Sequence, residues 1–336
     1  MFFLKRKRIW KLFAGMGLLV IFQFACSNEV KNNSKEINSE SNIKSEKLIN
    51  PQEMTIETRY GVPQGYKRVA VEKGSFAEFL RNQKLKPYGE KVQYFNGNYK
   101  RSEGICDSVF DVEIGDRDLH QCADAIMLLR AEYFYGKKEY DKISFKFVTG
   151  FNAQYSKWMQ GYRINPKGKG SYYKKSAPSN TYKDFRNFMN IVFGYAGTLS
   201  LEKEMIPQKI ENMQIGDVFI MGGSPGHAVI VVDMAKNEKG EKIFMLAQSY
   251  MPAQQTQILI NPENGGVWYS LKGKDMLVTP EWKFPVGKLK KFIINIFFNK
   301  INFLVSINGR SFYLFNYDCL MIERRNFGVG KIKVGV

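Results

Sequence analysis

The sequence predicts an α+β domain in which one buried helix packs on an antiparallel sheet. Two observations lead to this fold class. Apolar residues between Leu119 and Tyr133 recur at helical spacing, directly after a segment rich in strand-favouring residues. Three apolar segments between Gly216 and Gln248 then follow one another with short polar connections, a pattern typical of an antiparallel meander.

The chain begins like an exported protein. Basic residues at positions 5–8 and 11 precede an apolar run, 12–24, that is too short for a comfortable membrane span. Ala25 then stands before Cys26, the arrangement at which a lipoprotein signal peptidase cleaves to leave a diacylated cysteine. We expect a lipoprotein signal peptide over 1–25 and a lipid anchor at Cys26, with an ordinary signal peptide or an uncleaved anchor as the alternative.

Three further parts are expected. Residues 26–50 are mostly Ser, Asn, Lys, Glu and Ile without an aromatic residue, so they predict a flexible tether. Aromatic and aliphatic residues become dense from Pro51, which predicts one globular domain over 51–291. Asparagines interrupt the apolar run after Phe292, so residues 292–336 are expected to form an atypical C-terminal extension and not a membrane span.

The formal net charge of +18 makes the protein strongly basic. Such a surface suits anionic envelope polymers or phospholipid head groups. Basic residues are not interleaved regularly with aromatic ones, so we expect no nucleic-acid partner. No cofactor is expected. Paired Cys and His ligands are scarce, and the acidic residues 111, 116, 118 and 124 match no calcium loop, so no metal site is expected either.

The first chemically interesting residue is Cys122. A strand is expected from about Cys106 to Ile114, and Asp118 with Gln121 has the spacing of a capping box that would open a helix running to about Tyr135. Cys122 would lie in its first turn, where unpaired backbone N–H groups favour a thiolate and lower the thiol pKa. A cysteine at such a position is also common as a plain core residue.

Between this helix and the meander, a strand is expected over 142–148 and a helix over 182–193. An aromatic-rich stretch separates them. Its aromatic residues and those of a later segment either line a carbohydrate or peptide cleft or fill the core. They are Trp158, Tyr162, Trp268 and Tyr269.

The second candidate is His227, which starts a predicted strand after the glycine-rich turn 222–226. A neutral imidazole is the usual general base near pH 7. A hairpin turn near Glu238 would pair residues whose numbers sum to roughly 475 or 476, so His227 would face Gln248 or Ser249. Gln248 would then orient the ring, whereas a register slip of one residue would turn it to the other face. A lone histidine at a strand start is often only structural.

Together these residues predict the chemistry of a cysteine hydrolase, with Cys122 as nucleophile, His227 as general base and Gln248 as the residue that orients the imidazole. The N–H of Cys122, helped by Gln121, would stabilise the oxyanion. The remaining candidates for contact with substrate are Ser224, Ser249 and Trp158.

The remaining histidine and cysteines are not expected to take part in catalysis. His120 lies two positions from Cys122 and is directed elsewhere on the helix, so it is expected to face solvent or cap the helix. Cys106 can bridge to Cys122, but a reduced Cys122 is favoured, and Cys319 lies in the atypical extension.

Six stretches of the sequence resemble a bacterial family described as domain of unknown function 4846. The resemblance covers nearly all of residues 51–292 and implies no established activity. The stretches are Tyr60-Gly61-Val62-Pro63-Gln64-Gly65-Tyr66, Gln121-Cys122-Ala123-Asp124-Ala125, Arg130-Ala131-Glu132-Tyr133, the segment from Gly216 to Ala228, the segment from Ala247 to Gln254, and Thr279-Pro280-Glu281-Trp282.

A second, weaker resemblance is to a group of enzymes. Gly216-Asp217, followed by the segment 226–231, is similar to the histidine strand of papain-like amidases and peptidases of the NlpC and CHAP kinds, which act on cell-wall peptides. Their helix-start cysteine corresponds to Cys122 and their third polar residue to Gln248. About 105 residues separate the cysteine from His227, more than in those compact enzymes, which requires an insertion carrying residues 158–197.

This second resemblance implies a papain-like core and an exported cysteine amidase or peptidase of the bacterial cell envelope, tethered to a membrane. Its expected partners are membrane lipid, through acylated Cys26, and peptidoglycan or another anionic envelope polymer. The alternative is a non-catalytic envelope lipoprotein that binds glycan or a partner protein.

Overall fold

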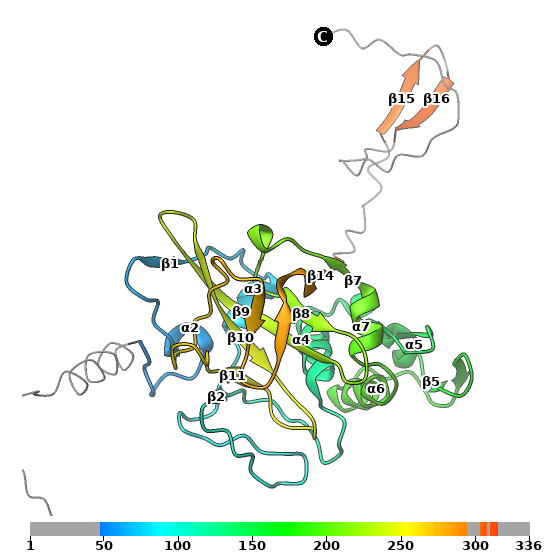
Figure 1. Ribbon diagram of the computed structural model, residues 1–336. Helices are drawn as coiled ribbons and strands as arrows, with labels where there is room; N and C mark the ends of the chain where they lie inside the picture. The colour runs from blue at the N-terminus through cyan, green and yellow to red at the C-terminus, as the bar shows by residue number, and fades with distance from the viewer. Residues whose placement is uncertain (1–47, 294–302, 308–309, 315–336) are drawn as a thin grey trace, which may run out of the picture. The chain divides into compact units, whose positions relative to one another are not determined.

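The computed structural model describes residues 48–293, 303–307 and 310–314 (Figure 1). The predicted signal peptide, Cys26 and nearly all of the predicted tether lie outside the described residues, as does most of the predicted extension, including Cys319. Within that extension, β15 (Phe303–Ile307) and β16 (Arg310–Leu314) pair as an antiparallel hairpin. No helix in the described ranges is both long and apolar enough to cross a membrane.

An eight-stranded sheet forms the centre of the body at 48–293 (Figure 1). Its order is β2-β11-β10-β9-β8-β14-β7, with β1 paired to β9, and every pairing is antiparallel. Strands β8, β9 and β10 are neighbours in the chain and in the sheet, so the predicted meander is confirmed. The strands are β1 (Tyr66–Arg68), β2 (Cys106–Val109), β7 (Met205–Pro207), β8 (Val218–Met221), β9 (His227–Asn237), β10 (Lys242–Gln248), β11 (Gln257–Leu259) and β14 (Leu289–Phe292).

Helices cover one face of this sheet. Ile126 and Met127 of helix α4 (Cys122–Gly136) belong to the same buried cluster as Ala228, Ile230 and Val232 of β9. The other helices and two small hairpins enlarge this cluster. They are α2 (Ile56–Arg59), α3 (Phe76–Arg81), α5 (Tyr155–Met159), α6 (Tyr182–Tyr195) and α7 (Thr198–Glu204), and β3 (Ser144–Lys146) paired with β4 (Asn152–Gln154) and β5 (Tyr162–Asn165) paired with β6 (Ser171–Lys174).

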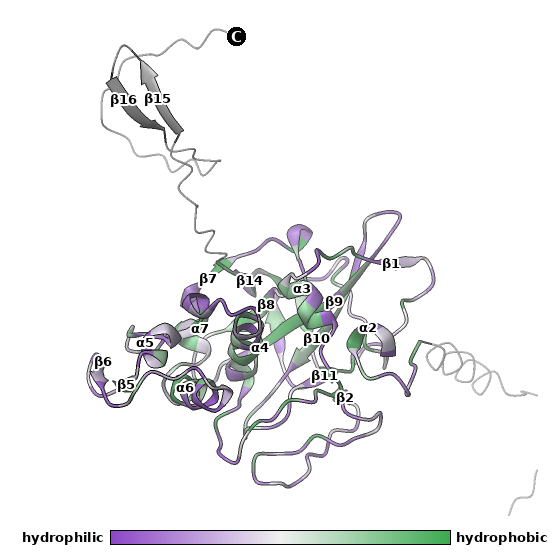
Figure 2. Cartoon of the chain, turned by 180° about the vertical axis from the view of Figure 1, so that it is seen from behind, coloured by the Kyte–Doolittle hydropathy of each residue, from purple (hydrophilic) through white to green (hydrophobic). Residues whose placement is uncertain are grey.

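The opposite face of the sheet carries a smaller cover. Side chains alternate along β9, so Val229 and Val231 point away from the helices and join a second buried cluster. Phe284 belongs to that cluster and lies on a two-stranded hairpin, β12 (Met276–Val278) with β13 (Lys283–Pro285). Figure 2, which shows the body from the helical side, colours the strands at the centre of the sheet as hydrophobic.

The register of β9 with β10 differs from the predicted one. Paired residue numbers sum to 478 near the turn, as in Lys236 with Lys242, and to 477 beyond a β-bulge at Met245 and Leu246. The bulge inserts Val232 as an extra residue in β9. Asp233 beside it is fully buried and accepts hydrogen bonds from two arginine side chains, at 2.7 and 2.8 Å, that fix this part of the strand.

The predicted helices are present with altered bounds. The second predicted helix corresponds to α6, as expected. Helix α4 begins at Cys122 and not near Leu119, because its N-cap is Gln121. The carboxylate of Asp124 accepts the backbone N–H of Gln121 at 3.0 Å, so the predicted capping box with Asp118 as N-cap is wrong. Cys122 therefore occupies the first position of the helix.

Two predicted strands are shorter than expected. The first is reduced to β2, which ends at Val109, and the second to β3, preceded by a 3-10 turn at Tyr140–Lys142. Each pairs with a single neighbouring strand, β2 with β11 at the edge of the central sheet and β3 with β4 in a separate hairpin.

Candidate functional site

Cys122 is held in place by the segment that precedes it. The carboxylate of Asp118 accepts hydrogen bonds from the N–H of Ala253 at 2.7 Å and from the side chain of Gln121 at 3.0 Å. The hydroxyl of Ser249 donates to the carbonyl of His120 at 2.8 Å. Segment 118–121 is thereby fastened to the loop that follows β10, and this fixes the start of α4 against the end of that strand.

The thiol of Cys122 is neutral in this environment. Only 6% of the residue is exposed, and this burial, together with the charge of Asp124, raises the thiol pKa to about 12. Backbone N–H groups of Ala123, Ala228 and Cys122 itself oppose the rise. The helix N-terminus thus acts in the expected direction, but the expectation of a net lowered pKa is wrong because desolvation of the buried sulfur is the larger effect.

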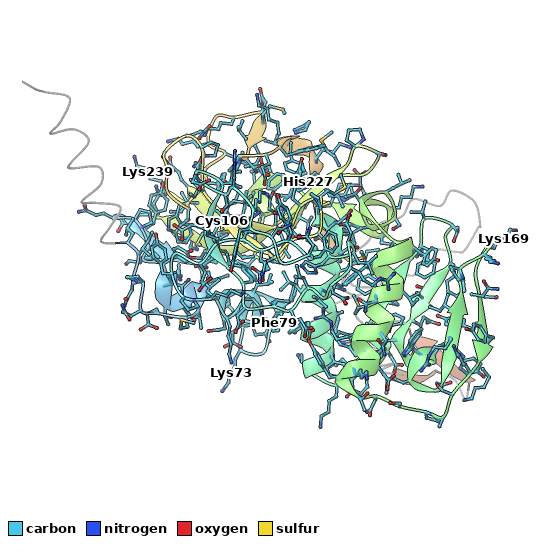
Figure 3. The ribbon with its side chains drawn as sticks, turned by 90° about the horizontal axis from the view of Figure 1, so that it is seen from below. Lys73, Phe79, Cys106, Lys169, His227 and Lys239 are labelled. Carbon is cyan, nitrogen blue, oxygen red and sulfur yellow. The ribbon has the colours of Figure 1, made fainter. Side chains whose placement is uncertain are left out.

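His227 is buried on the other side of the sheet. It is 1% exposed, and its ring packs between Tyr250, Trp282 and Phe284 with centroid distances of 4.7, 5.3 and 5.8 Å. Figure 3 shows it inside the body, away from the outer loops that carry Lys169 and Lys239. Burial lowers the pKa of the imidazole to about 4, so the ring is neutral near pH 7.

The imidazole is bound to Gln248, as the sequence suggested. The distance from Nε2 of His227 to Oε1 of Gln248 is 2.8 Å. By the observed register these residues are diagonal neighbours and not directly opposite, but both side chains lie on the face away from the helices. The predicted contact is present although the predicted register was wrong, because the observed register also places both side chains on the same face of the sheet.

Two residues that the sequence did not single out for this site extend the contact. The side-chain N–H of Gln248 donates to Oε2 of Glu281 at 2.6 Å, and both oxygens of Glu281 accept from the ammonium of Lys100 at 2.6 and 2.7 Å. A carboxylate paired with Lys100 only accepts hydrogen bonds, so Gln248 must present its nitrogen to Glu281 and its oxygen to His227. His227 must then carry its proton on Nε2, which leaves a lone pair on Nδ1.

The sulfur of Cys122 lies close to the backbone of β9. The ladder between β9 and β10 ends at Ile230. The N–H of Val231 bonds toward β8, and donors alternate along a strand, so the N–H of Ala228 points toward β10 beyond the end of the ladder. That N–H lies close enough to the sulfur of Cys122 to lower its pKa. The thiol therefore lies beside the residue that follows His227.

Cys122 and His227 are not hydrogen-bonded to each other. Nδ1 of His227 makes no hydrogen bond with another residue of the described ranges, and neither group shifts the pKa of the other. The ring of Tyr250 contacts the imidazole, with the centroids 4.7 Å apart, and burial raises the pKa of this tyrosine. The structure thus pairs His227 with Gln248 and places the sulfur of Cys122 beside the N–H of Ala228, without a contact between the sulfur and the imidazole.

A cleft of about 400 Å³ opens at Cys122. The start of α4, the end of α6, the start of α7 and the glycine-rich turn 223–226 form its walls, and His227 is not among its lining residues. The turn is packed tightly: a Cβ atom at Gly226 would collide with Thr198 and lie 2.7 Å from the carbonyl oxygen of Gly223. A larger residue there would push the turn off α7 and displace the first residue of β9.

The other predicted site residues divide into two groups. Gln121 and Ser224 line the cleft, and one of the two side-chain N–H groups of Gln121 donates to Asp118. The hydroxyl of Ser249 is buried and bound to two backbone carbonyls. Trp158 is a core residue packed edge-to-face against Phe188 and is not among the residues that line the cleft.

The remaining aromatic candidates are also mainly structural. Trp268 is buried and its indole N–H donates to the carbonyl of Gly61 at 3.0 Å. Tyr269 is buried and donates to the carbonyl of Ile260 at 2.7 Å. Tyr162 is half-buried on the β5–β6 hairpin. These contacts favour the core interpretation over a carbohydrate cleft built from these rings.

His120 does not face solvent, so that expectation is wrong. It is 1% exposed, its Nε2 lies 3.0 Å from the hydroxyl of Thr256, and burial lowers its pKa to about 3. Cys106 and Cys122 are both free thiols. Among the residues that the structure describes, no group of three or more His, Cys, Asp or Glu side chains is arranged to hold a metal ion.

Sequence reasoning missed Glu281 and Lys100 for different reasons. Glu281 lies in one of the stretches that carry the family resemblance, but nothing in its spacing connects it with His227. Lys100 lies 181 positions away from Glu281 in a loop before β2. Only the folded loops bring the two charges to the end of β10, where they fix the amide of Gln248.

Comparison of the chain with curated proteins and with solved structures gives no match. The family model described as domain of unknown function (4846) matches residues 56–291, which include Cys122, His227, Gln248, Glu281 and Lys100. The chain therefore belongs to the family of domain of unknown function 4846.

Proposed function

We propose that this protein is an exported, membrane-tethered cysteine hydrolase that cleaves an amide in the cell envelope, such as a cell-wall peptide bond. Cys122 is the nucleophile, His227 the general base and Gln248 the residue that orients the imidazole. The observation that carries the proposal is the hydrogen bond from Nε2 of His227 to Gln248, because it leaves the lone pair on Nδ1 free to accept a proton.

The chemistry follows from two neutral groups. With a thiol pKa of about 12 and an imidazole pKa of about 4, a resting thiolate–imidazolium pair is disfavoured. His227 takes the thiol proton as the sulfur attacks the carbonyl carbon, and the backbone N–H of Cys122 stabilises the oxyanion. The C–N bond then breaks, the amine leaves with that proton, and water cleaves the thioester to regenerate the thiol.

This step requires a small rearrangement at the site. The imidazole or the turn 223–226 has to move so that Nδ1 reaches the sulfur, because His227 does not line the cleft at Cys122. Substrate in the cleft would lie against Cys122 and this turn. Apo structures often show catalytic hydrogen bonds that are long or absent and that form only in the complex.

A papain-like arrangement and the lipid anchor belong to the same proposal. The antiparallel sheet, the cysteine at a helix start and the histidine at a strand start support the papain-like assignment. The basic, apolar and small residues up to Cys26 support export and acylation. Labelling of cells with an alkyne-bearing palmitate should mark the wild-type chain and fail to mark Cys26→Ala.

The test of the catalytic proposal uses a second cysteine of the same chain. Cys106 is half-buried, its thiol pKa is also raised to about 12, and no histidine is among the groups that shift it. With iodoacetamide near pH 7, peptide mass mapping should show faster alkylation at Cys122 than at Cys106. His227→Gln should remove the excess at Cys122 and leave Cys106 unchanged. Equal rates in the wild-type chain would rule out base assistance by His227.

The alternative is that the cleft only binds glycan or a partner protein. Two observations favour this alternative. His227 does not line the cleft, and several apolar residues do line it: Val148, Phe193, Pro225 and Met251. A chain that binds cell-wall fragments equally well with Cys122→Ser, and that releases no amine from them as the wild-type protein, would establish this alternative.

A further inference from the structure

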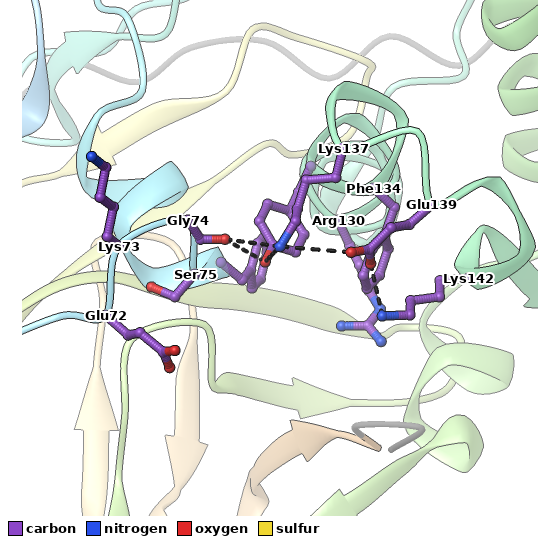
Figure 4. A pocket seen from close by; sticks show the side chains of 11 residues that line it. Glu72, Lys73, Gly74, Ser75, Arg130, Phe134, Lys137, Glu139 and Lys142 are labelled. Carbon is purple, nitrogen blue, oxygen red and sulfur yellow. Dashed lines mark hydrogen bonds and ion pairs between the residues drawn. The ribbon is translucent and has the colours of Figure 1, made fainter. Parts of the chain in front are cut away.

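A second pocket, remote from Cys122, is rich in cations. Its volume is about 380 Å³, and it lies between segment 72–76 and the C-terminal half of α4 (Figure 4). Four basic side chains line it against two acidic ones, and three aromatic rings supply an apolar wall. The basic residues are Lys73, Arg130, Lys137 and Lys142, the acidic ones Glu72 and Glu139, and the rings Phe76, Tyr133 and Phe134.

Glu139 neutralises part of this charge. Its carboxylate lies 2.7 Å from the ammonium of Lys142 and 3.6 Å from that of Lys137. Lys137 is also bound to the carbonyl of Gly74 at 3.2 Å and to the hydroxyl of Tyr133 at 3.3 Å. Hydrogen bonding to Lys142 lowers the pKa of Glu139, so this carboxylate is ionised near pH 7.

Among the residues that the structure describes, Arg130 has no such carboxylate partner. Its guanidinium lies over the rings of Phe134 and Phe292, at 4.9 and 4.2 Å from their centroids. Its one hydrogen bond to a described residue is a long one, 3.4 Å, to the carbonyl of Ile293. Burial lowers its pKa to about 10, which still leaves it charged at pH 7.

One acidic residue, Glu204, influences Arg130 without forming an ion pair with it. The charge of Glu204 raises the pKa of Arg130, but its carboxylate accepts the backbone N–H of Lys146 at 2.6 Å and forms no ion pair with the guanidinium. Arginine has five N–H donors, so most of those of Arg130 are left for a ligand. A cation held in place by packing, without a carboxylate, is typical of an anion site.

We propose that this pocket binds the phosphate group of an anionic ligand that also has an apolar portion. Arg130 provides paired donors that match phosphate oxygens, Lys142 and Lys137 add charge, and the ring of Phe76 contacts the apolar portion. Phospholipid head groups and soluble phosphate esters share this chemistry. The inference is independent of the hydrolase proposal.

The test is calorimetric titration of the full chain with three probes. Dihexanoyl phosphatidylglycerol, below its critical micelle concentration, is expected to bind. Dihexanoyl phosphatidylcholine should bind at least tenfold more weakly, since its ammonium group would lie among the lysines. Glycerol 3-phosphate that binds as tightly as the phosphatidylglycerol identifies a soluble ester as the source, whereas much weaker binding identifies a lipid. Equal affinity for the two lipids would overturn the proposal.

Three variants sharpen the result. Arg130→Gln should weaken phosphatidylglycerol binding at least tenfold, whereas Glu139→Gln should tighten it severalfold because it releases two lysines and removes a negative charge. Lys239→Gln, which removes a lysine on the exposed turn between β9 and β10, is the matched control and should change nothing. Unchanged affinity in a folded Arg130→Gln protein, or weaker binding by Glu139→Gln, contradicts the proposal. If Arg130→Gln does not fold, Lys142→Gln decides: at least threefold weaker binding supports the site, and wild-type affinity removes it.

Discussion

The two faces of the central sheet carry unlike halves of the candidate site. The helical face presents Cys122 at the start of α4, beside the backbone N–H of Ala228 on β9. The other face presents His227 and Gln248 under a two-stranded hairpin and a few aromatic rings. The difference teaches that the sulfur and the imidazole are buried by separate sets of residues on opposite faces of the sheet.

The two sides of the sheet should respond differently to a cavity in their packing. The largest effect on unfolding free energy is expected for a cavity on the hairpin side. Phe284→Ala removes a fully buried ring from the hairpin side and should cost about 3–5 kcal/mol of unfolding free energy. Water would then reach His227, so its pKa should rise from about 4 toward 6.5. Urea unfolding and an NMR titration of the histidine ring measure the two effects, and an unchanged pKa would show that another group keeps the imidazole dry.

The matching change on the helical side is Ile126→Ala. This residue is fully buried in α4, and its truncation should cost about 2–5 kcal/mol. The pKa of His227 should stay near 4, because the cavity opens on the opposite face of the sheet. A shift of the imidazole pKa in this variant would mean that the two sides of the sheet are coupled.

Acid should weaken the fold through the buried imidazoles. The pKa of His227 is lowered in the folded state, so between about pH 6.5 and pH 4 the unfolded chain binds a proton that the folded chain does not. Stability conferred by the neutral ring is therefore present above pH 6.5 and is lost as the pH falls toward 4. The unfolding free energies of the wild-type chain and of His227→Gln should differ in pH dependence by about 3 kcal/mol over this range.

That difference isolates His227 from other titrating groups. His120 acts in the same direction, since its pKa is lowered to about 3. Asp217 acts in the opposite direction, because burial raises its pKa to about 6 and the folded state holds that proton more tightly. Both groups are present in each protein and cancel in the comparison. Parallel stability curves would contradict a buried neutral His227.

The smallest effect is expected from Glu281→Gln, which tests whether the Lys100 ion pair fixes the ring through Gln248. An amide at position 281 can face Gln248 with either end, so the preference for the Nε2–H tautomer should weaken. Alkylation of Cys122 should slow about tenfold, less than the 10²-fold lower bound for general-base catalysis. Glu263→Gln, which removes an exposed carboxylate paired with Lys274, should leave both the tautomer ratio from ¹⁵N NMR and the rate unchanged.

Local patterns predicted much of this molecule. The meander was readable because its turns are short and its strands strongly apolar, and α6 because its apolar residues keep helical spacing. The start of α4 was misplaced because Asp118 and Asp124 both have capping chemistry, and the tertiary bond from Ala253 engages the first of them. Spacing alone does not distinguish a cap from a loop anchor.

The site was only partly predictable. Gln248 could be named because hairpin geometry limits which residues lie beside His227. The pKa directions depend on burial by segments far apart in sequence, and Glu281 and Lys100 come from loops that no periodicity describes. The roles of Trp158 and His120 were misjudged for the same reason: exposure is a property of the whole fold and not of a residue's immediate neighbours.

The bulge in β9 also sets the parity of the strand. Val232 is the extra residue that lets Asp233 pair with Met245 while Val231 pairs with Leu246. This one insertion therefore determines which face of the sheet each side chain from His227 to Val231 points to. A chain shortened by Val232 would keep these pairs in an unbroken ladder, with the imidazole still on the face of Gln248. A chain that kept Val232 and paired it with Leu246 would instead turn the imidazole toward the helices, away from Gln248.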